Sequence, residues 1–339
     1  MQIEQNISLK PFNTFGIDVV AKHFVRFTSL QDLYDLLEIK QFKKDESLLT
    51  IGGGSNILLT RNYNGLVAKN EMLGTEVIHK DEQHVYVRVA AGENWHQFVL
   101  YCINNNFAGV ENLSLIPGNV GASPMQNIGA YGVEIKDVFH ELEAVNINEK
   151  RLEIFTADQC EFGYRESIFK RKYKGLFIIT SVTFRLKKKP DFNVGYGAIQ
   201  QELERLNIKE LSIVAISQAV INIRRSKLPD PDEIGNAGSF FKNPAIPQQQ
   251  FEELKKTFPQ IVGYAAGGNE IKVAAGWLIE QCGWKGYRKG DAGCYAKQAL
   301  VLVNYGRAKG SELFELSTEI IKSVETKFGI KLEREVNIL

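Results

Sequence analysis

The sequence predicts an α+β protein made of two or three domains. Three observations lead to this expectation: the length of 339 residues, a first half in which strand-like segments predominate, and a final third with strong helical periodicity. Hydrophobic residues make up 44% of the chain and charged residues 24%, which is the balance of an ordinary globular protein. This composition excludes a disordered, coiled-coil or collagen-like chain.

We expect residues 1–70 to form the first domain. Apolar positions at helical spacing predict a helix over 30–39, and the apolar run 48–51 predicts a strand. That strand leads into a glycine turn at 52–56 and then into a second short apolar segment at 57–59. The domain therefore alternates strands and helix.

Residues 71–228 form the second expected domain, which is richer in strands. Strands are predicted at 85–89 and 175–184, with one helix at 95–105 between them. A charged loop follows at 187–191, and an amphipathic helix at 211–225 ends before two prolines that mark a boundary.

The third expected domain, residues 229–328, is α+β and opens with a turn rich in Gly and Asn. Helices are predicted at 247–257, 274–282 and 310–328, and a strand at 299–303. Residues 329–339 read either as a charged tail or, from their apolar positions, as a strand that returns to a sheet.

Charge and targeting signals restrict the partners and the compartment. Lys and Arg number 41 against 40 Asp and Glu, so the net charge of +1 argues against a general affinity for nucleic acid or anionic membranes. The first six residues lack the features of a secretory signal, and 211–223 is too short and polar to span a bilayer, so we expect a cytoplasmic protein. The spacings of the four Cys and five His predict no metal site.

Two glycine-rich segments are candidates for binding a ligand. The run 52–56 follows a strand, where glycines let backbone N–H groups approach a phosphate, although it fits neither the dinucleotide nor the P-loop motif and also suits a tight structural turn. Residues 115–132 form a long loop with four glycines, in which Gln126 and Asn127 supply donors and acceptors suited to a flavin or a nucleobase. A structural loop without a ligand remains the alternative.

Four polar positions have both a functional and a structural interpretation. Arg165 suits a carboxylate or an enolate, or a surface ion pair, and Ser239 suits a proton donor or a turn. The basic end of the 211–225 helix suits a diphosphate or an ordinary solvated helix terminus, and Glu335 suits the returning strand or a tail.

Six motifs, taken in order, resemble the UDP-N-acetylenolpyruvoylglucosamine reductase family from about residue 11 to the end. They are Asn13–Gly16, Gly52–Asn56, Ile116–Gly121 with Gln126–Gly132, Gly163–Ser167, Gly238–Pro244 and Leu332–Val336. Gly195–Gly197 and Tyr264, in an expected loop over 261–269, resemble the longer type, in which a tyrosine loop closes over the substrate. One departure is the segment 122–125, where the family more often has Gly-Ala-Pro-Ile.

The resemblance implies a fold, a cofactor and a reaction. The fold would be an FAD-binding half of the p-cresol methylhydroxylase type, made of two subdomains, with a C-terminal α+β domain that binds the substrate. The family uses NADPH and non-covalent FAD to reduce UDP-N-acetylglucosamine enolpyruvate to UDP-N-acetylmuramate, an early step of peptidoglycan synthesis. We expect a monomer that acts on small molecules.

The resemblance also implies residue roles. Arg165 and Glu335 would polarise the substrate carboxylate, and Ser239 would be the general acid. The residues implied in cofactor binding are Gly52, Gly53, Gly54, Ser55, Asn56, Ile116, Pro117, Gly118, Gly121, Ala122, Ser123, Gln126, Asn127, Gly129, Ala130, Tyr131 and Gly132. Those implied in substrate binding are Tyr164, Tyr196, Lys227, Asn243, Tyr264 and Gln298.

Two other interpretations stay open. Another FAD-dependent oxidoreductase of the same fold is the first, although a covalent flavin link would require a His or Cys in the cofactor segments, and no His lies at 52–56 or 116–132. A catalytically inactive UDP-sugar sensor is the second, and it would have lost Arg165, Ser239 or Glu335, all of which are present.

Overall fold

The computed structural model describes residues 1–39 and 47–339, and this part of the chain divides into two compact units. The first unit comprises Met1–Ile7, Ala21–Gly53 and Tyr63–Ser226. The second comprises Ser8–Val20, Gly54–Asn62 and Lys227–Leu339. Each unit therefore draws on segments that are far apart in the sequence.

A four-stranded sheet and one helix come from the N-terminal part of the first unit. The sheet has the order β1 (Glu4–Ser8), β2 (Val20–Phe27), β5 (Tyr63–Asn70), β3 (Leu48–Ile51). β5 pairs in parallel with both β2 and β3. Helix α1 (Leu30–Glu38) begins at a capping box in which Ser29 accepts from the Asp32 N–H, and its buried leucines pack against the sheet. The helix and strand predicted at 30–39 and 48–51 are confirmed.

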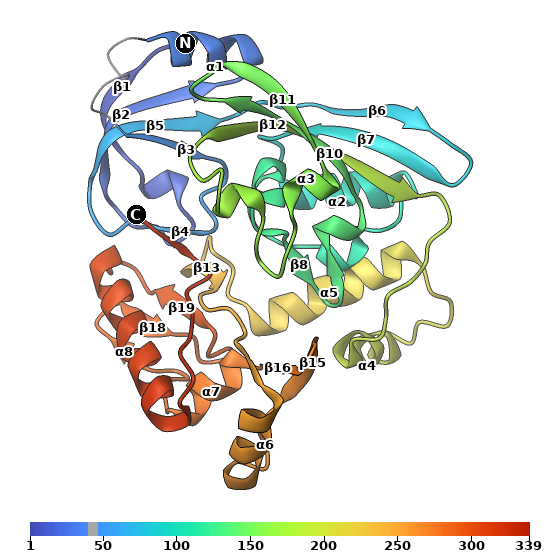
Figure 1. The fold of residues 1–339 in the computed structure, drawn as a ribbon, viewed down its shortest axis with the longest axis vertical. Coiled ribbons are helices and arrows are strands. Elements are labelled where there is room, and N and C mark those ends of the chain that lie inside the picture. Colours follow the sequence, from blue (N-terminus) through green and yellow to red (C-terminus); the bar gives the residue numbers. More distant parts are fainter. Residues whose placement is uncertain (40–46) are drawn as a thin grey trace. The chain divides into compact units, whose positions relative to one another are not determined.

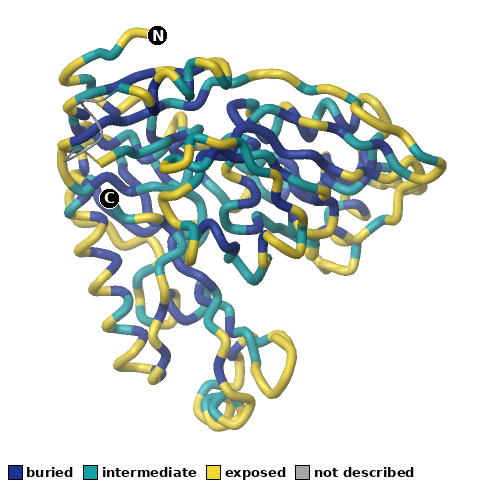
Figure 2. Tube along the Cα trace, turned by 45° about the horizontal axis from the view of Figure 1, so that its top comes forward, coloured by how far each residue is buried: buried dark blue, intermediate teal, exposed yellow. Residues whose placement is uncertain are grey.

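A five-stranded antiparallel sheet forms the largest core of the first unit. Its order is β11 (Arg151–Thr156), β10 (Phe139–Asn146), β12 (Phe177–Lys187), β7 (His84–Ala90), β6 (Thr75–Lys80). Helix α2 (Trp95–Asn104) packs its buried face against this sheet, below it in Figure 1. The central strand β12 is almost continuously buried, because both of its faces are covered. In Figure 2 the buried residues form long dark stretches of the trace, whereas exposed residues gather at loops.

The predicted loop over 115–132 is wrong as a single irregular segment. The chain from α2 to β10 instead forms short 3-10 turns and one small hairpin. These elements are η3 (Glu111–Leu113), η4 (Val120–Ala122), η5 (Pro124–Gln126), β8 (Gly129–Ala130), β9 (Val133–Glu134) and η6 (Ile135–Asp137). Because successive backbone bonds close within the segment, it is rigid without long regular structure.

Two helices with their own small core complete the first unit. α4 (Gly197–Arg205) and α5 (Ile213–Lys227) pack together through buried aliphatic residues. The helix predicted at 211–225 is therefore confirmed with a shift of two residues at each end. The short elements α3 (Ala157–Cys160) and η7 (Ile168–Lys170) connect β11 to β12.

The second unit contains small sheets and three longer helices. Its strands are β4 (Ile57–Leu58), β13 (Gly235–Ser239), β14 (Ala245–Pro247), β15 (Gly263–Gly267), β16 (Glu270–Val273), β17 (Arg288–Lys289), β18 (Ala292–Cys294), β19 (Val301–Asn304) and β20 (Asn337–Ile338). Its helices are α6 (Gln248–Thr257), α7 (Ala275–Gln281) and α8 (Gly310–Phe328), with the 3-10 turn η1 (Lys10–Phe12). The three predicted helices and the strand near 299–303 are confirmed.

Two local predictions in the second unit are wrong. The expected turn rich in Gly and Asn is β13, which pairs antiparallel with β19 around a bulge. The expected loop that carries Tyr264 is the antiparallel hairpin β15–β16. Both segments are rich in small residues and have weak apolar alternation, so partner strands decide their structure.

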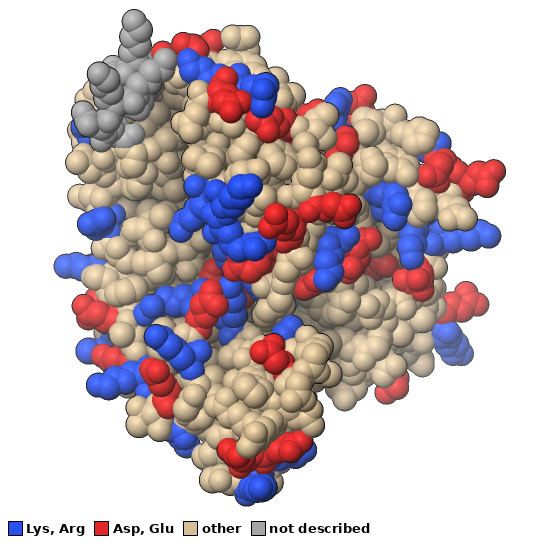
Figure 3. Space-filling model, in the orientation of Figure 1, with Lys and Arg blue, Asp and Glu red and all other residues tan. Residues whose placement is uncertain are grey.

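Charges and hydropathy add two observations. Positive and negative side chains are interspersed over much of the face shown in Figure 3. Within the described part of the chain, no helix has both the length and the apolar character needed to cross a bilayer.

Candidate cofactor and catalytic site

The turn after β3 and the turn before η4 are in direct contact within the first unit. A Cβ atom on Gly53 would lie 2.7 Å from Oδ1 of Asn119 and 2.9 Å from Cα of Gly118. A Cβ on Gly52 would lie 3.2 Å from Cβ of Asn119. The absence of side chains therefore lets these two predicted cofactor segments, 66 positions apart in the chain at Gly52 and Gly118, pack backbone against backbone.

Unused backbone donors gather where these turns meet. In residues 1–39 and 47–339, the N–H groups of Gly53, Gly118 and Asn119 donate no hydrogen bond to the protein. Lys69 donates from Nζ to the Gly52 carbonyl oxygen at 2.8 Å, so a cation stands beside the turn. Burial lowers the pKa of Lys69, and Arg26 adds to this while Glu71 opposes it. Free N–H groups at a glycine turn and a nearby cation fit a pyrophosphate such as that of FAD.

The β8–β9 hairpin turns at Tyr131 and Gly132, two predicted cofactor residues. Both have positive φ, +49° and +81°, as a two-residue hairpin turn of the primed type requires. Nδ2 of Asn112 donates to the backbone carbonyl oxygen of Tyr131 at 3.1 Å, and Nδ2 of Asn193 donates to that of Gly132 at 2.9 Å. The ring of Tyr196 lies edge-on to that of Tyr131, with centroids 5.3 Å apart. The predicted substrate residue Tyr196 thus adjoins the predicted cofactor hairpin.

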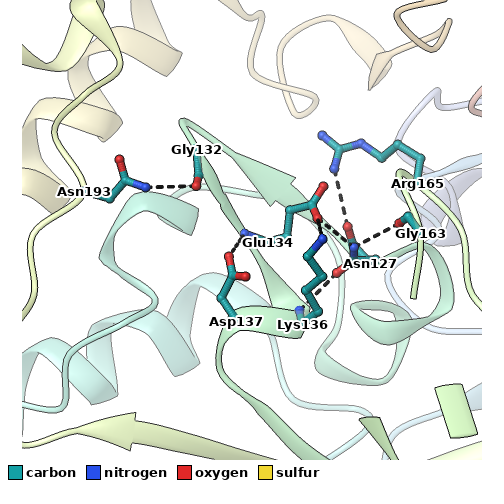
Figure 4. Close-up of polar contacts among 8 residues, drawn as sticks. All are labelled: Asn127, Gly132, Glu134, Lys136, Asp137, Gly163, Arg165 and Asn193. Atoms are coloured by element: carbon teal, nitrogen blue, oxygen red, sulfur yellow. Dashed lines mark hydrogen bonds and ion pairs between the residues drawn. The ribbon is translucent and has the colours of Figure 1, made fainter. Parts of the chain in front are cut away.

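The guanidinium of Arg165 is held against the same hairpin (Figure 4). Nη2 donates to the backbone carbonyl oxygen of Gly129 at 2.6 Å, and Nη1 donates to the backbone carbonyl oxygen of Asn127 at 3.4 Å. Arg165 has a left-handed backbone, with φ +55°, and its guanidinium lies 5.4 Å from the centre of the Tyr164 ring. Its head group is thus oriented by carbonyls and an aromatic face, a suitable arrangement for presenting a fork to a carboxylate.

A second cation, Arg224, lies close to this region. It donates from Nε to the Leu115 oxygen at 3.1 Å. Burial lowers the pKa of Arg224, as does the proximity of Arg165, whereas Tyr131 raises it. The interpretation of Arg224 as part of a solvated helix end is therefore wrong, because α5 directs it into the protein. Among the described residues no carboxylate is paired with this half-buried guanidinium, so the region favours an anionic ligand.

His96 fixes the entry to the second glycine segment. Its Nδ1 accepts from the N–H of Leu115 at 3.0 Å, and Leu115 has a left-handed φ of +58°. Burial lowers the pKa of His96, and the charges of Arg225 and Arg224 add to the effect. The neutral form of the imidazole is the one that accepts this hydrogen bond.

Sequence reasoning missed Lys69, Asn119 and His96 as parts of this region. Asn119 donates from Nδ2 to the Gly92 oxygen and so ties the second turn to the end of β7. The spacing of these residues in the sequence shows nothing unusual. A basic or amide residue directly beside a glycine run, such as Asn119 after Gly118, was the one available signal.

Ser239 ends β13 in the second unit. Gly238 before it has φ +67°, and its N–H donates to Oδ1 of Asn236 at 3.0 Å, which closes the bulge that opposes β19. The Ser239 hydroxyl is half-buried and makes no hydrogen bond to any described residue. It is therefore available to a ligand as a proton donor.

The segment that carries Glu335 pairs with the chain just after Ser239. The backbone N–H of Glu335 donates to the carbonyl oxygen of Phe240 at 2.8 Å, and the backbone N–H of Lys242 donates to the carbonyl oxygen of Glu333 at 2.9 Å. Nδ2 of Asn56 donates to the backbone carbonyl oxygen of Glu335 at 3.4 Å. Directly after this segment, β20 pairs with β4. Ser239, Glu335 and Asn56, three predicted site residues, are thus neighbours in the fold.

The remaining predicted residues are distributed over both units. Gly52 and Gly53 belong to the first unit, whereas Gly54, Ser55 and Asn56 belong to the second. Ser123 uses its hydroxyl internally, on the Val120 oxygen at 2.7 Å.

Four predicted substrate residues lie in the second unit. Oδ1 of Asn243 accepts from the Ala275 N–H at 2.9 Å, and Oε1 of Gln298 accepts from the Leu300 N–H at 3.3 Å. Lys227 and Tyr264 are exposed, Tyr264 by 57% on strand β15. Two of the four therefore have their side chains engaged in structure, and two face solvent.

Two family profiles match the chain. The FAD binding domain matches residues 21–154, and the UDP-N-acetylenolpyruvoylglucosamine reductase C-terminal domain matches residues 230–339. Together they cover the glycine segments and both Ser239 and Glu335.

Relatives named UDP-N-acetylenolpyruvoylglucosamine reductase match over the whole chain. The protein of Flavobacterium johnsoniae is 51% identical, with 100% of both chains covered. That of Pseudomonas savastanoi pv. phaseolicola is 48% identical over 100% of this chain and 99% of its own. The crystal structure of the reductase from Thermus caldophilus covers 100% of this chain and 99% of its own with a TM-score of 0.70, and at 22% identity it supports the fold. The chain belongs to the UDP-N-acetylenolpyruvoylglucosamine reductase family.

Proposed function

We propose that this protein is an FAD-dependent oxidoreductase that uses NADPH to reduce UDP-N-acetylglucosamine enolpyruvate to UDP-N-acetylmuramate for peptidoglycan synthesis. Family membership over the full chain supports the reaction. The observation that carries the proposal is the Ser239 hydroxyl, which has no acceptor among the described residues and stands beside the strand segment of Glu335. A reduction of a carbon–carbon double bond needs such a proton donor.

The first unit would hold the cofactor. The N–H groups of Gly53, Gly118 and Asn119, with Lys69 close by, would bind the pyrophosphate of FAD. When bound, FAD supplies the hydride chemistry, taking a hydride from NADPH and giving it to the enolpyruvyl group. The implied contacts of the 116–132 segment with the flavin are part of this proposal, except that of Asn127, whose side-chain amide is fully hydrogen-bonded within the protein.

The catalytic residues would then deal with charge and with the proton. Hydride addition to the terminal carbon of the enolpyruvyl group places negative charge on its carboxylate, and the fixed charge of Arg165 would stabilise it, assisted by Glu335. Ser239 would deliver the proton to the adjacent carbon. The hydroxyl proton is acidic enough for this step because the developing enolate carbon is a strong base.

The substrate contacts and the domain division extend this assignment. Tyr164, Tyr196, Lys227, Asn243, Tyr264 and Gln298 would contact the UDP-sugar. Residues 1–70 and 71–228 would be the two FAD-binding subdomains, 229–328 the substrate domain, and 329–339 the returning strand. The exposure of Tyr264 on a hairpin suits a residue that closes over a bound ligand.

We also propose that the protein is a cytoplasmic monomer. The mixed charges of its surface and its net charge of +1 suit action on small molecules. Light scattering of the purified protein tests the monomer, and fractionation of cells tests the compartment.

An anaerobic visible spectrum tests the function. NADPH should bleach the flavin absorbance of the purified protein, and UDP-N-acetylglucosamine enolpyruvate should restore it. A flavin that bleaches but is not restored by this substrate would indicate another oxidoreductase of the same fold. A protein that cannot be reconstituted with FAD would refute the assignment altogether.

A further inference from the structure

Asn127 has a completely buried side chain whose hydrogen bonds are all made within the protein (Figure 4). Oδ1 accepts from the Lys136 N–H at 3.1 Å. Nδ2 donates to Oε2 of Glu134 at 3.0 Å and to the Gly163 oxygen at 3.0 Å. Both N–H groups of the amide are therefore used, so the side chain has no donor left for a flavin edge.

The same residue is connected to Arg165 at two points. Its side chain holds the carbonyl of Gly163, and residues 163 and 166 exchange backbone hydrogen bonds of 3.0 and 3.3 Å around the turn that carries Arg165. Its own carbonyl accepts from Nη1 of Arg165 at 3.4 Å. Asn127 and Arg165 both have left-handed backbones, with φ of +44° and +55°. These angles are unfavourable for residues with side chains and persist where neighbouring contacts hold them.

Glu134 is the second part of this arrangement. Its carboxylate accepts from Asn127 and pairs with Lys136 Nζ at 2.9 Å, while its N–H donates to Oδ2 of Asp137 at 2.8 Å. A Cβ on Gly129 would lie 2.8 Å from Cγ of Glu134 and 3.0 Å from Nη1 of Arg165. Glu134 and the guanidinium thus lie close together on the same side of one glycine, so a shift of the Glu134 side chain changes the space available to the arginine.

We propose that Asn127 and Glu134 are positioning residues that hold the guanidinium of Arg165 in the orientation needed for the substrate carboxylate, and that Asn127 acts on Arg165 rather than on the flavin. This inference rests on the proposed function, because it assumes the role that was proposed there for Arg165. A planar fork stabilises a carboxylate only when its angle is right. A misplacement of about 1 Å in such a group slows reaction by about 100-fold.

The test separates the two half-reactions in the FAD-loaded protein by stopped-flow absorbance. Asn127→Asp keeps the acceptor for the Lys136 N–H but turns the donor side into a carboxylate facing Glu134 and a carbonyl. We expect reoxidation by UDP-N-acetylglucosamine enolpyruvate to slow by about 10- to 100-fold. Reduction by NADPH should change by less than about threefold, since it does not need Arg165.

Asn70→Asp is the matched control. Asn70 is also buried in the first unit, donates to the Ile179 oxygen at 3.2 Å and accepts from the Met72 N–H at 3.1 Å, and none of these residues belongs to the proposed site. If the effect of Asn127→Asp reflects only the burial of a charge, both variants will slow flavin reoxidation to the same extent, and the proposal is overturned. The free energy of unfolding of both variants shows whether they are matched in stability.

A swap of donor and acceptor gives a second test that general destabilisation would not pass. In Asn127→Asp with Glu134→Gln, the glutamine amide can donate to the new carboxylate, so reoxidation should recover by about tenfold over Asn127→Asp alone. No recovery would contradict the role of the pair.

Arg165→Lys distinguishes this inference from the proposed function. If it leaves reoxidation unchanged, the role of Arg165 is wrong and the positioning role falls with it. If it slows reoxidation, adding Asn127→Asp should cause little further loss, because the two changes act on the same interaction. Fully multiplicative losses, or a weakened affinity for FAD as the main effect, would place Asn127 with the flavin and overturn the proposal.

Discussion

Gly53→Ala tests whether the contact between the two glycine turns is needed to bind FAD. The new methyl carbon would lie 2.7 Å from Oδ1 of Asn119 and 2.9 Å from Cα of Gly118. The second neighbour is backbone, so rotation of a side chain cannot relieve the contact. The turns must separate by several tenths of an ångström, which moves the N–H groups that would hold the pyrophosphate.

The expected loss in affinity follows from the size of this overlap. Overpacking by one methyl group costs about 1 to 3 kcal/mol. The protein without cofactor relieves the strain by separating the turns, whereas the pyrophosphate needs the N–H groups at their present spacing, so most of this cost falls on the bound state. We therefore expect the Kd for FAD to rise by about 5- to 150-fold.

Titration of the cofactor-free protein with FAD, followed by flavin fluorescence, measures this change. Gly197→Ala is the control, because no atom lies within 4 Å of a Cβ at Gly197 and the residue begins α4, where alanine is favourable. A Gly53→Ala protein that binds FAD within twofold of the unmodified protein would refute the reasoning.

Three further predictions concern single side chains. Ser239→Ala should leave reduction of the flavin by NADPH intact and slow reoxidation by about 100- to 10,000-fold in stopped-flow traces, and equal losses in both would refute the role. Arg165→Lys should lower kcat/KM strongly in steady-state assays, because an ammonium lacks the planar fork, and near-normal turnover would contradict this. The pKa of His96 is lowered in the folded state from 6.5, so the unfolded chain binds more protons and stability should be lost as the pH falls below about 6.5. In thermal melts between pH 5 and 8, His96→Asn should flatten this dependence, because an amide oxygen can accept the Leu115 N–H without titrating.

The sequence predicts elements best where periodicity and local caps agree. α8 has the predicted bounds 310–328, and its C-terminus at Gly329 has a left-handed φ of +65° that glycine adopts easily. The hairpin β15–β16 was not predicted, because its strand Gly263–Gly267 contains four small residues and no buried one. Its pairing depends on β16, which is information that a local pattern does not contain.

For the site, glycine runs were informative and isolated polar residues were not. The run 52–54 and the glycines at 118 and 121 marked both turns, because a backbone contact excludes side chains whatever else surrounds it. Lys69 lies on β5, and nothing in the alternation of that strand shows that Nζ reaches the Gly52 oxygen. Asn127 was predicted as a cofactor contact from its chemistry and from the family resemblance. Its side chain instead bonds to residues 7 and 36 positions away in the chain, and only the fold brings these partners together.

Backbone strain at three residues with side chains connects these observations. Asn127, Tyr131 and Arg165 all have φ between +44° and +55°, and such conformations cost about 1 to 3 kcal/mol each. Side-chain hydrogen bonds between segments hold each of these residues. Asn127 is held by the bonds of its own amide to Glu134 and Gly163, and Tyr131 by the bond from Asn112. Arg165 is held by the bond of its guanidinium to the Gly129 carbonyl of the hairpin. A residue that must hold such a conformation does so only while its contacts are intact. The orientation of Arg165 is therefore a property of the whole hairpin, and changes at residues that touch no ligand should alter the chemistry before they unfold the protein.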